Sequence, residues 1–163
     1  MYNLNHIHMK SNDPEKAANW WVDNFGFTIV DDSTRETGDR FIKCRSANDV
    51  PVNISGPLDG QTLVESDSGP NLGLEHFGFD VEDIDAELKR LAAVGAPLVD
   101  GPNELPDGTR FCWVQAPDNV RLELIQWPSY IIETLHFQSL EGRRLAKDPE
   151  ITNTPYQIPR RHS

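Results

Sequence analysis

Four polar residues of this chain recur at one spacing and belong to types that bind metals or move protons. His6 lies 47 positions before Asn53, and His76 lies 47 positions before Glu123. Two neutral imidazoles and one carboxylate that converge on one point form the ligand set of a divalent metal ion with open coordination positions. We therefore expect His6, His76 and Glu123 to be metal ligands. Asn53 takes the position in the first copy that Glu123 takes in the second.

The spacing comes from an internal repeat with an offset of 70 residues. LNHIHM at 4–9 aligns with LEHFGF at 74–79, and RFIKCRSANDVPVNIS at 40–55 aligns with RFCWVQAPDNVRLELI at 110–125. Fixed-offset similarity of this kind indicates two copies of one structural unit, each about 55 residues long.

Each copy has the pattern of a strand, a helix and then further strands. Asp13-Pro14 predicts the start of a helix that ends at Gly26, and Asp83 and Gly95 predict the equivalent helix of the second copy. Segments rich in Val, Ile, Phe and Trp, separated by turn residues, follow each helix. We therefore expect an α+β fold of two tandem βαβββ modules, which form a cleft-enclosing, barrel-like mixed sheet with the helices outside.

The repeat also gives the domain boundaries. We expect a first βαβββ module at 1–56, a linker at 57–73, a second βαβββ module at 74–127, and a C-terminal extension at 128–163 that includes an extended basic arm.

Strand alternation predicts which side chains face the cleft. In the first strand His6 and His8 alternate with Ile7 and Met9, so the two histidines share the polar face. Glu123 lies between two leucines and faces the same way in its own module. On this polar face His8 is the candidate general base for a proton-transfer step.

Composition excludes several classes of function. A net charge of −11 argues against binding to nucleic acid or to an anionic membrane surface. The chain has no apolar run of about 20 residues and no visible secretory signal, and its two cysteines are too few for a disulfide scaffold. We expect a soluble cytoplasmic protein that forms a homodimer, because pairing would cover the exposed edge of a half-sheet.

The segments LNHIHMKSNDPEKAANWWVDNFGF, LEHFGFDVEDIDAELKRLAAVGAPL and DGTRFCWVQAPDNVRLELIQW resemble the vicinal oxygen chelate (VOC) superfamily. This superfamily contains glyoxalases, extradiol dioxygenases, epimerases and the bleomycin- and fosfomycin-resistance proteins. The resemblance covers about residues 4–127. It implies that His6, His76 and Glu123 bind the metal and that Asn53 stands where glyoxalase- and epimerase-like members carry Glu or Gln. Because Asn cannot shuttle a proton as a carboxylate does, this departure disfavours a lactoylglutathione lyase.

The resemblance implies three alternative functions. The leading one is a glyoxalase-like metal-dependent enzyme of lyase or isomerase type, which binds both vicinal oxygens of a small molecule to a divalent ion such as Fe, Mn, Ni or Zn. The second is an Fe(II) ring-cleaving dioxygenase of the extradiol type. The third is a metal-free binding protein similar to the bleomycin-resistance proteins.

Overall fold

The computed structural model of the chain describes residues 4–129. The predicted basic arm and most of the predicted C-terminal extension lie outside these described residues. No helix within 4–129 is long and apolar enough to cross a membrane.

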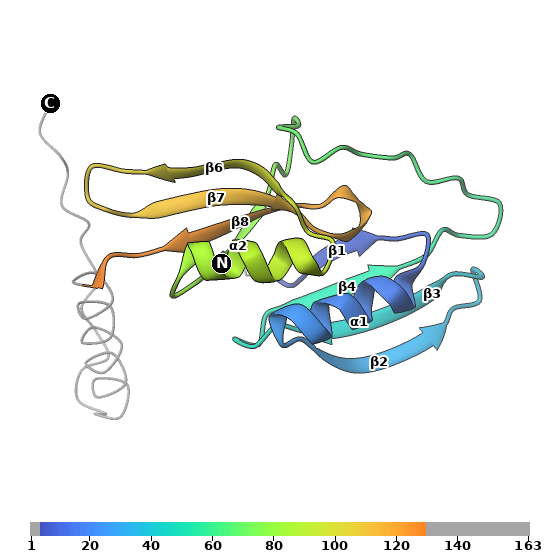
Figure 1. Cartoon of the computed structure of the whole chain (residues 1–163). Helices are drawn as coiled ribbons and strands as arrows, with labels where there is room; N and C mark the ends of the chain where they lie inside the picture. Colours follow the sequence, from blue (N-terminus) through green and yellow to red (C-terminus); the bar gives the residue numbers. More distant parts are fainter. Residues whose placement is uncertain (1–3, 130–163) are drawn as a thin grey trace, which may run out of the picture.

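The first module is a four-stranded sheet with one helix (Figure 1). Its elements are β1 (Ile7–Lys10), α1 (Pro14–Phe25), β2 (Thr28–Thr34), β3 (Arg40–Arg45) and β4 (Pro51–Ser55). The strand order is β1-β4-β3-β2, in which β1 runs parallel to β4 and the other neighbours are antiparallel.

The second module repeats this topology. Its elements are β5 (Phe77–Asp80), α2 (Ile84–Ala93), β6 (Leu98–Glu104), β7 (Arg110–Gln115), a short 3-10 helix (Pro117–Asn119) and β8 (Arg121–Gln126). The strand order is β5-β8-β7-β6, again with a single parallel pair at the edge. The predicted tandem βαβββ fold is therefore confirmed.

The helix boundaries follow the predicted capping residues. The Asp13 side chain accepts a hydrogen bond from the backbone N–H of Lys16, and Gly26 ends α1 with φ of 63°. The Asp83 side chain caps α2 in the same way, and Gly95 follows that helix with φ of 82°. Glycine adopts these left-handed angles at no steric cost, so the local sequence suffices to end both helices.

Both modules contribute to one hydrophobic core. Trp21 of α1 is 1% exposed, and its ring centroid lies 5.8 Å from that of Phe77 and 6.3 Å from that of Phe79 on β5. Trp20 also donates a hydrogen bond of 3.1 Å from its indole Nε1 to the Val94 carbonyl at the end of α2. The apolar faces of both sheets belong to this shared core, so their polar faces lie on the outside of it.

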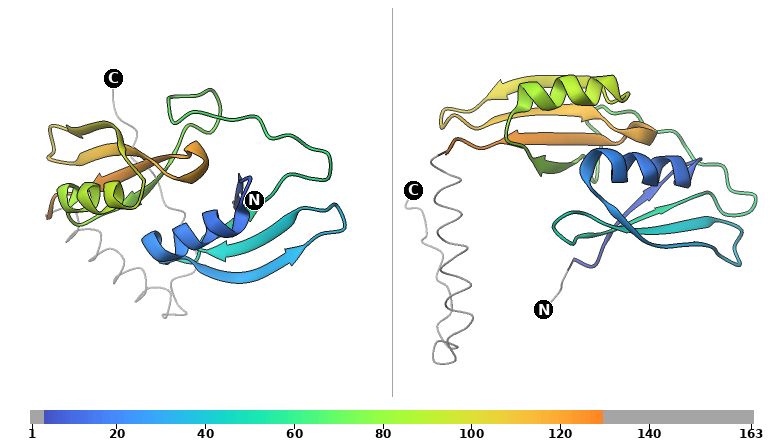
Figure 2. Two further views of the ribbon diagram at one scale, coloured as in Figure 1. Left: turned by 45° about the vertical axis from the view of Figure 1, so that its right-hand side comes forward. Right: turned by 60° about the horizontal axis from the view of Figure 1, so that its bottom comes forward.

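The two sheets are not closed into a barrel. β1 and β5 are the edge strands of separate sheets, and α1 packs between the modules against the aromatic side chains of β5 (Figures 1 and 2). Packing of α1 against β5 holds the modules together in place of pairing between their edge strands.

The linker at 57–73 arches from the first sheet to the second (Figure 2). Asn119 donates a hydrogen bond of 2.8 Å to the Ser66 carbonyl, and Arg121 donates one of 2.8 Å to the Ser68 carbonyl. The linker is thereby attached to the start of β8, near the residues predicted to do chemistry.

Candidate metal centre

Two of the predicted ligands meet on the second module. His76 directly precedes β5, Glu123 lies within β8, and β5 pairs with β8 in parallel. The His76 Nε2 atom is 3.1 Å from Glu123 Oε2, and both side chains are partly buried. Two ligand atoms about 2.1 Å from one ion and at right angles to each other are about 3 Å apart, so this pair has the separation of two ligands of one divalent ion.

Gly78 provides the space that the Glu123 carboxylate occupies. The two residues are direct partners in the parallel ladder. A Cβ atom on Gly78 would lie 3.2 Å from Glu123 Oε2 and 3.4 Å from Glu123 Cβ, which is tighter than ordinary contact. The glycine therefore allows the carboxylate to fold back toward His76.

Three further residues of the second module surround His76, and sequence reasoning did not select any of them. The Glu75 carboxylate contacts His76 Nδ1, and the Arg121 guanidinium lies 2.7 Å from that same carboxylate. Arg121 also stacks over the Trp113 ring at 4.7 Å, and Trp113 meets His76 edge-on at 5.9 Å. The repeat offers a signal for Glu75, which aligns with Asn5 at the offset of 70.

The hydrogen bonds around His76 favour a cation at its Nε2 atom. An ionised carboxylate accepts hydrogen bonds only, so the contact with Glu75 places a proton on Nδ1, and a ring with this single proton has its lone pair on Nε2. That lone pair faces the Glu123 carboxylate at 3.1 Å. Two acceptors that face each other at this distance need a cation or a proton between them, so the donor set fits a divalent metal ion.

The other predicted ligand, His6, lies on the first module. It directly precedes β1, is exposed, and its Nδ1 atom is 2.7 Å from Asn5 Oδ1. Its ring centroid is 6.2 Å from that of His8, so the predicted ligand and the predicted base are neighbours.

The surroundings of His8 favour its neutral imidazole. Its Nε2 atom lies 2.9 Å from the buried Ser55 hydroxyl, and its ring meets Phe41 edge-on at 5.3 Å. Burial lowers the pKa of His8 below its usual 6.5, and the nearby Lys10 contributes to the same shift. A neutral imidazole at neutral pH has a lone pair with which to accept a proton.

Asn53 lies between two nitrogen-bearing side chains in its sheet. It pairs with His8 on β1 and with Lys43 on β3. Lys43 in turn forms an ion pair of 3.0 Å with Asp31 on β2.

Within residues 4–129, no group of three or more His, Cys, Asp or Glu side chains is close enough to hold a metal ion. His76 and Glu123 come together on one sheet, whereas His6 belongs to the other. A single copy of the chain therefore presents two ligands in one place and the third elsewhere.

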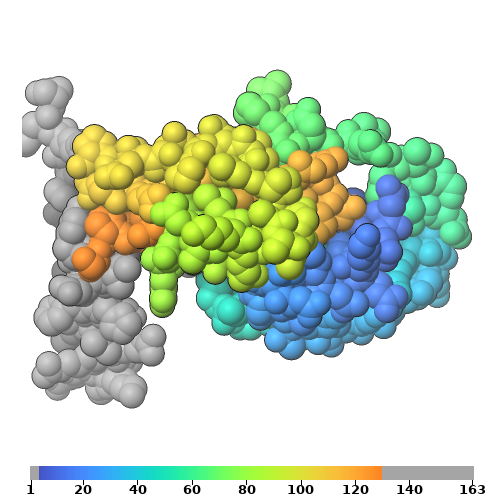
Figure 3. All heavy atoms as spheres, viewed as in Figure 1, coloured from blue at the N-terminus to red at the C-terminus, as the bar shows by residue number. Residues whose placement is uncertain are grey.

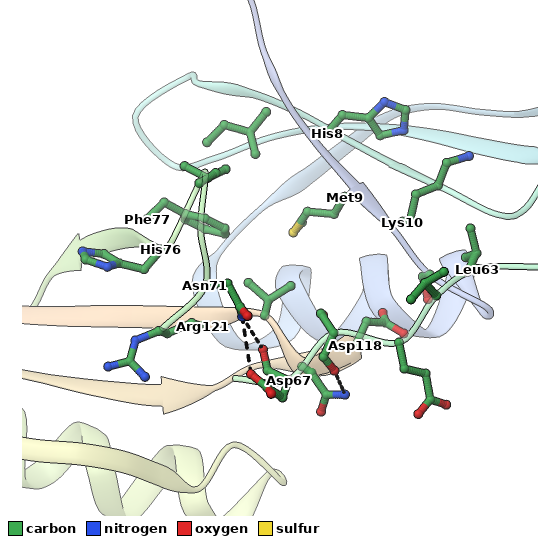
Figure 4. A pocket seen from close by; sticks show the side chains of 18 of the residues that line it. His8, Met9, Lys10, Leu63, Asp67, Asn71, His76, Phe77, Asp118 and Arg121 are labelled. Carbon is green, nitrogen blue, oxygen red and sulfur yellow. Dashed lines mark hydrogen bonds between the residues drawn. The ribbon is translucent and has the colours of Figure 1, made fainter. Parts of the chain in front are cut away.

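A cavity of about 470 Å³ lies between β1, β5 and the linker. Figure 4 shows His8 and His76 on different sides of it, with Met9, Asn71 and Phe77 nearby. Figure 3 shows the surface hollowed where the linker passes over the modules. The volume is in the range of small-molecule sites.

A profile of the Glyoxalase/Bleomycin resistance protein/Dioxygenase superfamily matches residues 3–124. The chain belongs to this superfamily. The resemblance of the repeated histidine segments to VOC proteins is thereby confirmed. The curated proteins contain no match.

Solved structures of this superfamily share the fold of the chain. A glyoxylase/bleomycin resistance protein/dioxygenase domain from Frankia sp. EAN1pec is 20% identical, with a TM-score of 0.64 over 79% of this chain and 94% of that one. A glyoxalase family protein from Bacillus cereus is 18% identical, with a TM-score of 0.67 over 77% and 94%. The fosfomycin resistance protein FosX from Listeria monocytogenes is 18% identical, with a TM-score of 0.62 over 80% and 97%. FosX has also been solved in complex with Mn(II) and sulfate.

Proposed function

We propose that this protein is a glyoxalase-like metal-dependent enzyme of lyase or isomerase type, which acts on a small molecule with vicinal oxygens. The observation that carries the proposal is the distance of 3.1 Å between His76 Nε2 and Glu123 Oε2. The other ring nitrogen of His76, Nδ1, contacts the Glu75 carboxylate. Superfamily membership and the known Mn(II) complex of FosX support the same proposal.

His76, Glu123 and His6 would hold the divalent ion, which is Fe, Mn, Ni or Zn. The ion would supply Lewis-acid polarisation of two neighbouring substrate oxygens. A FosX variant has been solved with Mn(II) and 1S,2S-dihydroxypropylphosphonic acid, whose name specifies two neighbouring hydroxyl groups. This relative supports a vicinal dioxygen compound as the substrate class.

The first module would supply the base. Burial lowers the pKa of His8, which favours the neutral ring, and the Ser55 hydroxyl lies 2.9 Å from its Nε2. When the hydroxyl donates to Nε2, the imidazole proton is on Nδ1; when the hydroxyl accepts from Nε2–H, the lone pair is on Nδ1 and can accept a proton. A substrate proton near His8 would be accepted by this ring.

We propose that the enzyme is a homodimer in which a second copy completes each site. The polar faces that carry His6 and His76 lie outside the shared core, so one copy does not bring them together. A two-fold axis would place His6 of one copy against His76 and Glu123 of the other, and would form two equal sites. The edge strands β2 and β6 also expose apolar side chains, among them Val30 and Leu98, which a second copy would cover.

Mixing two inactive variants tests the composite site. His6→Ala and Glu123→Gln should each abolish tight binding of Zn²⁺. In mixed dimers one site would carry both changes and the other neither, so each mixed dimer should regain one of its two Zn²⁺ sites. A clean monomer in sedimentation, or no recovery on mixing, would contradict the shared site.

The placement of Asn53 between His8 and Lys43 favours a second candidate function, the ring-cleaving dioxygenase. Without a fourth acidic ligand, the site has the two histidines and one carboxylate that Fe(II) dioxygenases use. Metal content after purification without a polyhistidine tag separates the alternatives. Nickel, zinc or manganese supports the lyase or isomerase, and stoichiometric iron supports ring cleavage. If the purified protein holds no metal and takes up none when metal is added, the third function, a metal-free binding protein, is supported.

A further inference from the structure

The residue that precedes each candidate ligand histidine contacts Nδ1 of that histidine. Asn5 Oδ1 lies 2.7 Å from His6 Nδ1, and the Glu75 carboxylate contacts His76 Nδ1. Asn5 and Glu75 are 70 positions apart, so they occupy the same place in the two modules. The same contact therefore occurs twice, in segments that share only Leu4/Leu74 besides the histidine.

Both contacts favour the same tautomer of a singly protonated ring. The amide oxygen and the ionised carboxylate are acceptors, so each draws the ring proton to Nδ1 and leaves the lone pair on Nε2. A histidine binds a metal through its unprotonated nitrogen, and a hydrogen bond to the other nitrogen also fixes the ring orientation. At His76, the nitrogen left free is the one that faces Glu123.

Only the second module anchors this acceptor. The Nε atom of Arg121 lies 2.7 Å from Glu75 Oε1, a close ion pair. The Arg121 side chain is only 7% exposed, because it is stacked on Trp113 and donates to the Ser68 carbonyl. In the first module the equivalent positions hold Pro51 and Lys43, which reproduce neither the guanidinium nor the indole.

We infer that Glu75, anchored by Arg121, is a positioning residue that holds His76 with Nε2 toward the metal, and that Asn5 does the same more weakly for His6. The inference rests on the proposed metal function. Because its acceptor is charged and anchored, the second module holds its histidine ready for the ion before the ion arrives. The first module presents an exposed histidine held by a neutral amide alone.

The tautomer of His76 in the metal-free full chain gives the direct test. Two-bond ¹H–¹⁵N correlation spectra distinguish a ring protonated at Nδ1 from one protonated at Nε2. The unchanged protein and Glu75→Gln should both show the Nδ1–H form, since glutamine keeps an acceptor oxygen. Glu75→Leu should shift His76 toward the Nε2–H form. A merely structural role of Glu75 would leave the tautomer unchanged in all three proteins.

Calorimetric titration with Zn²⁺ measures the consequence for the site. Glu75→Leu should weaken Zn²⁺ binding about 10- to 100-fold, and Glu75→Gln less, in keeping with the usual effect of outer hydrogen-bond partners on metal affinity. Asn5→Ala should weaken Zn²⁺ binding only about threefold, because the contact of Asn5 with His6 is neutral and exposed. Glu82→Gln removes one exposed carboxylate from the same module and should leave the affinity unchanged.

A third variant separates failure of this inference from failure of the proposed function. If His76→Ala leaves Zn²⁺ affinity unchanged, the metal site itself is wrong. If His76→Ala abolishes binding while Glu75→Leu changes neither the affinity nor the tautomer, the site stands and the positioning role of Glu75 is wrong.

Discussion

The two modules have the same strand order and matching capped helices, yet the residues across their polar faces differ in chemistry. On the first sheet the row that includes His8 runs through Asn53 and Lys43 to Asp31. On the second sheet the equivalent row runs from Gly78 through Glu123 and Trp113 to Asp100. One scaffold thus carries a histidine, an amide and an ion pair in one copy, and a carboxylate flanked by a glycine and an indole in the other.

This difference indicates that the two modules have different roles in the candidate site. In the second module no cation pairs with Glu123 in its row, so its charge is available to a metal ion. A carboxylate at Asn53 would instead lie beside Lys43 and be partly neutralised. We interpret the second module as the metal-binding half and the first as the half that supplies His6 and the base.

Other features of the repeat are the same in both modules and serve the scaffold. In the first module Arg40, at the start of β3, pairs with Glu15 in the first turn of α1. Arg110 and Asp85 form the equivalent pair in the second module, at 2.9 Å. The scaffold contacts therefore repeat, whereas the rows of side chains around His8 and around Glu123 do not.

The largest expected effect is the difference between Glu123 and Asn53. Glu123→Gln keeps the shape and removes the charge, so metal affinity should fall well over tenfold, which is more than about 1.4 kcal/mol. Asn53→Ala should change the affinity far less, because it removes at most one neutral group. Titration of the apo-protein with Mn²⁺, Ni²⁺ and Zn²⁺ measures both. Equal losses would show a symmetric four-ligand site and would favour a glyoxalase mechanism with Asn53 as a ligand.

A smaller effect is expected at Gly78. Gly78→Ala would place a methyl group 3.2 Å from Glu123 Oε2 and displace the carboxylate, so metal affinity should fall several-fold. In the Glu123→Gln variant, Gly78→Ala should lower metal affinity little further, because the carboxylate charge that Gly78→Ala displaces is already absent. Additive losses in this double-mutant cycle would mean that Gly78 acts independently of Glu123.

The smallest effect concerns stability and Asp39, whose place in the second module is taken by Thr109. The Arg35 guanidinium, with help from the Thr37 hydroxyl, lowers the pKa of the buried Asp39 carboxyl from 3.8 to about 2. A lowered pKa stabilises the fold above about pH 4, and this stabilisation is lost as the pH falls toward 2. Asp39→Asn should therefore lower the melting temperature at pH 7.

The pH dependence is the check on that prediction. The melting temperatures of Asp39→Asn and the unchanged protein should converge between about pH 4 and pH 2, since protonation also removes the charge of Asp39. Asp32→Asn breaks an exposed ion pair with Arg40 and should have a smaller effect at pH 7. Parallel curves for Asp39→Asn would show that its charge adds nothing to the stability.

The sequence by itself determined the elements and their repetition. Helix ends depend on residues within one turn, so Asp13, Gly26 and Asp83 sufficed to locate them. Strand alternation placed Leu122 and Leu124 in the core and left Glu123 on the polar face, because side chains in a strand alternate in direction. The repeat offset then paired His76 with Glu123, which the structure brings to 3.1 Å.

Only the tertiary structure decided how the modules pack and which residues support the candidate ligands. The alternation pattern is compatible with a closed barrel or with two separate sheets, and the packing of Trp21 against Phe77 selects the second. The contact between Arg121 and Glu75 joins residues far apart in the chain, so no local pattern reports it. Such contacts depend on the placement of whole elements, and that placement is set by the shared core rather than by spacing along the sequence.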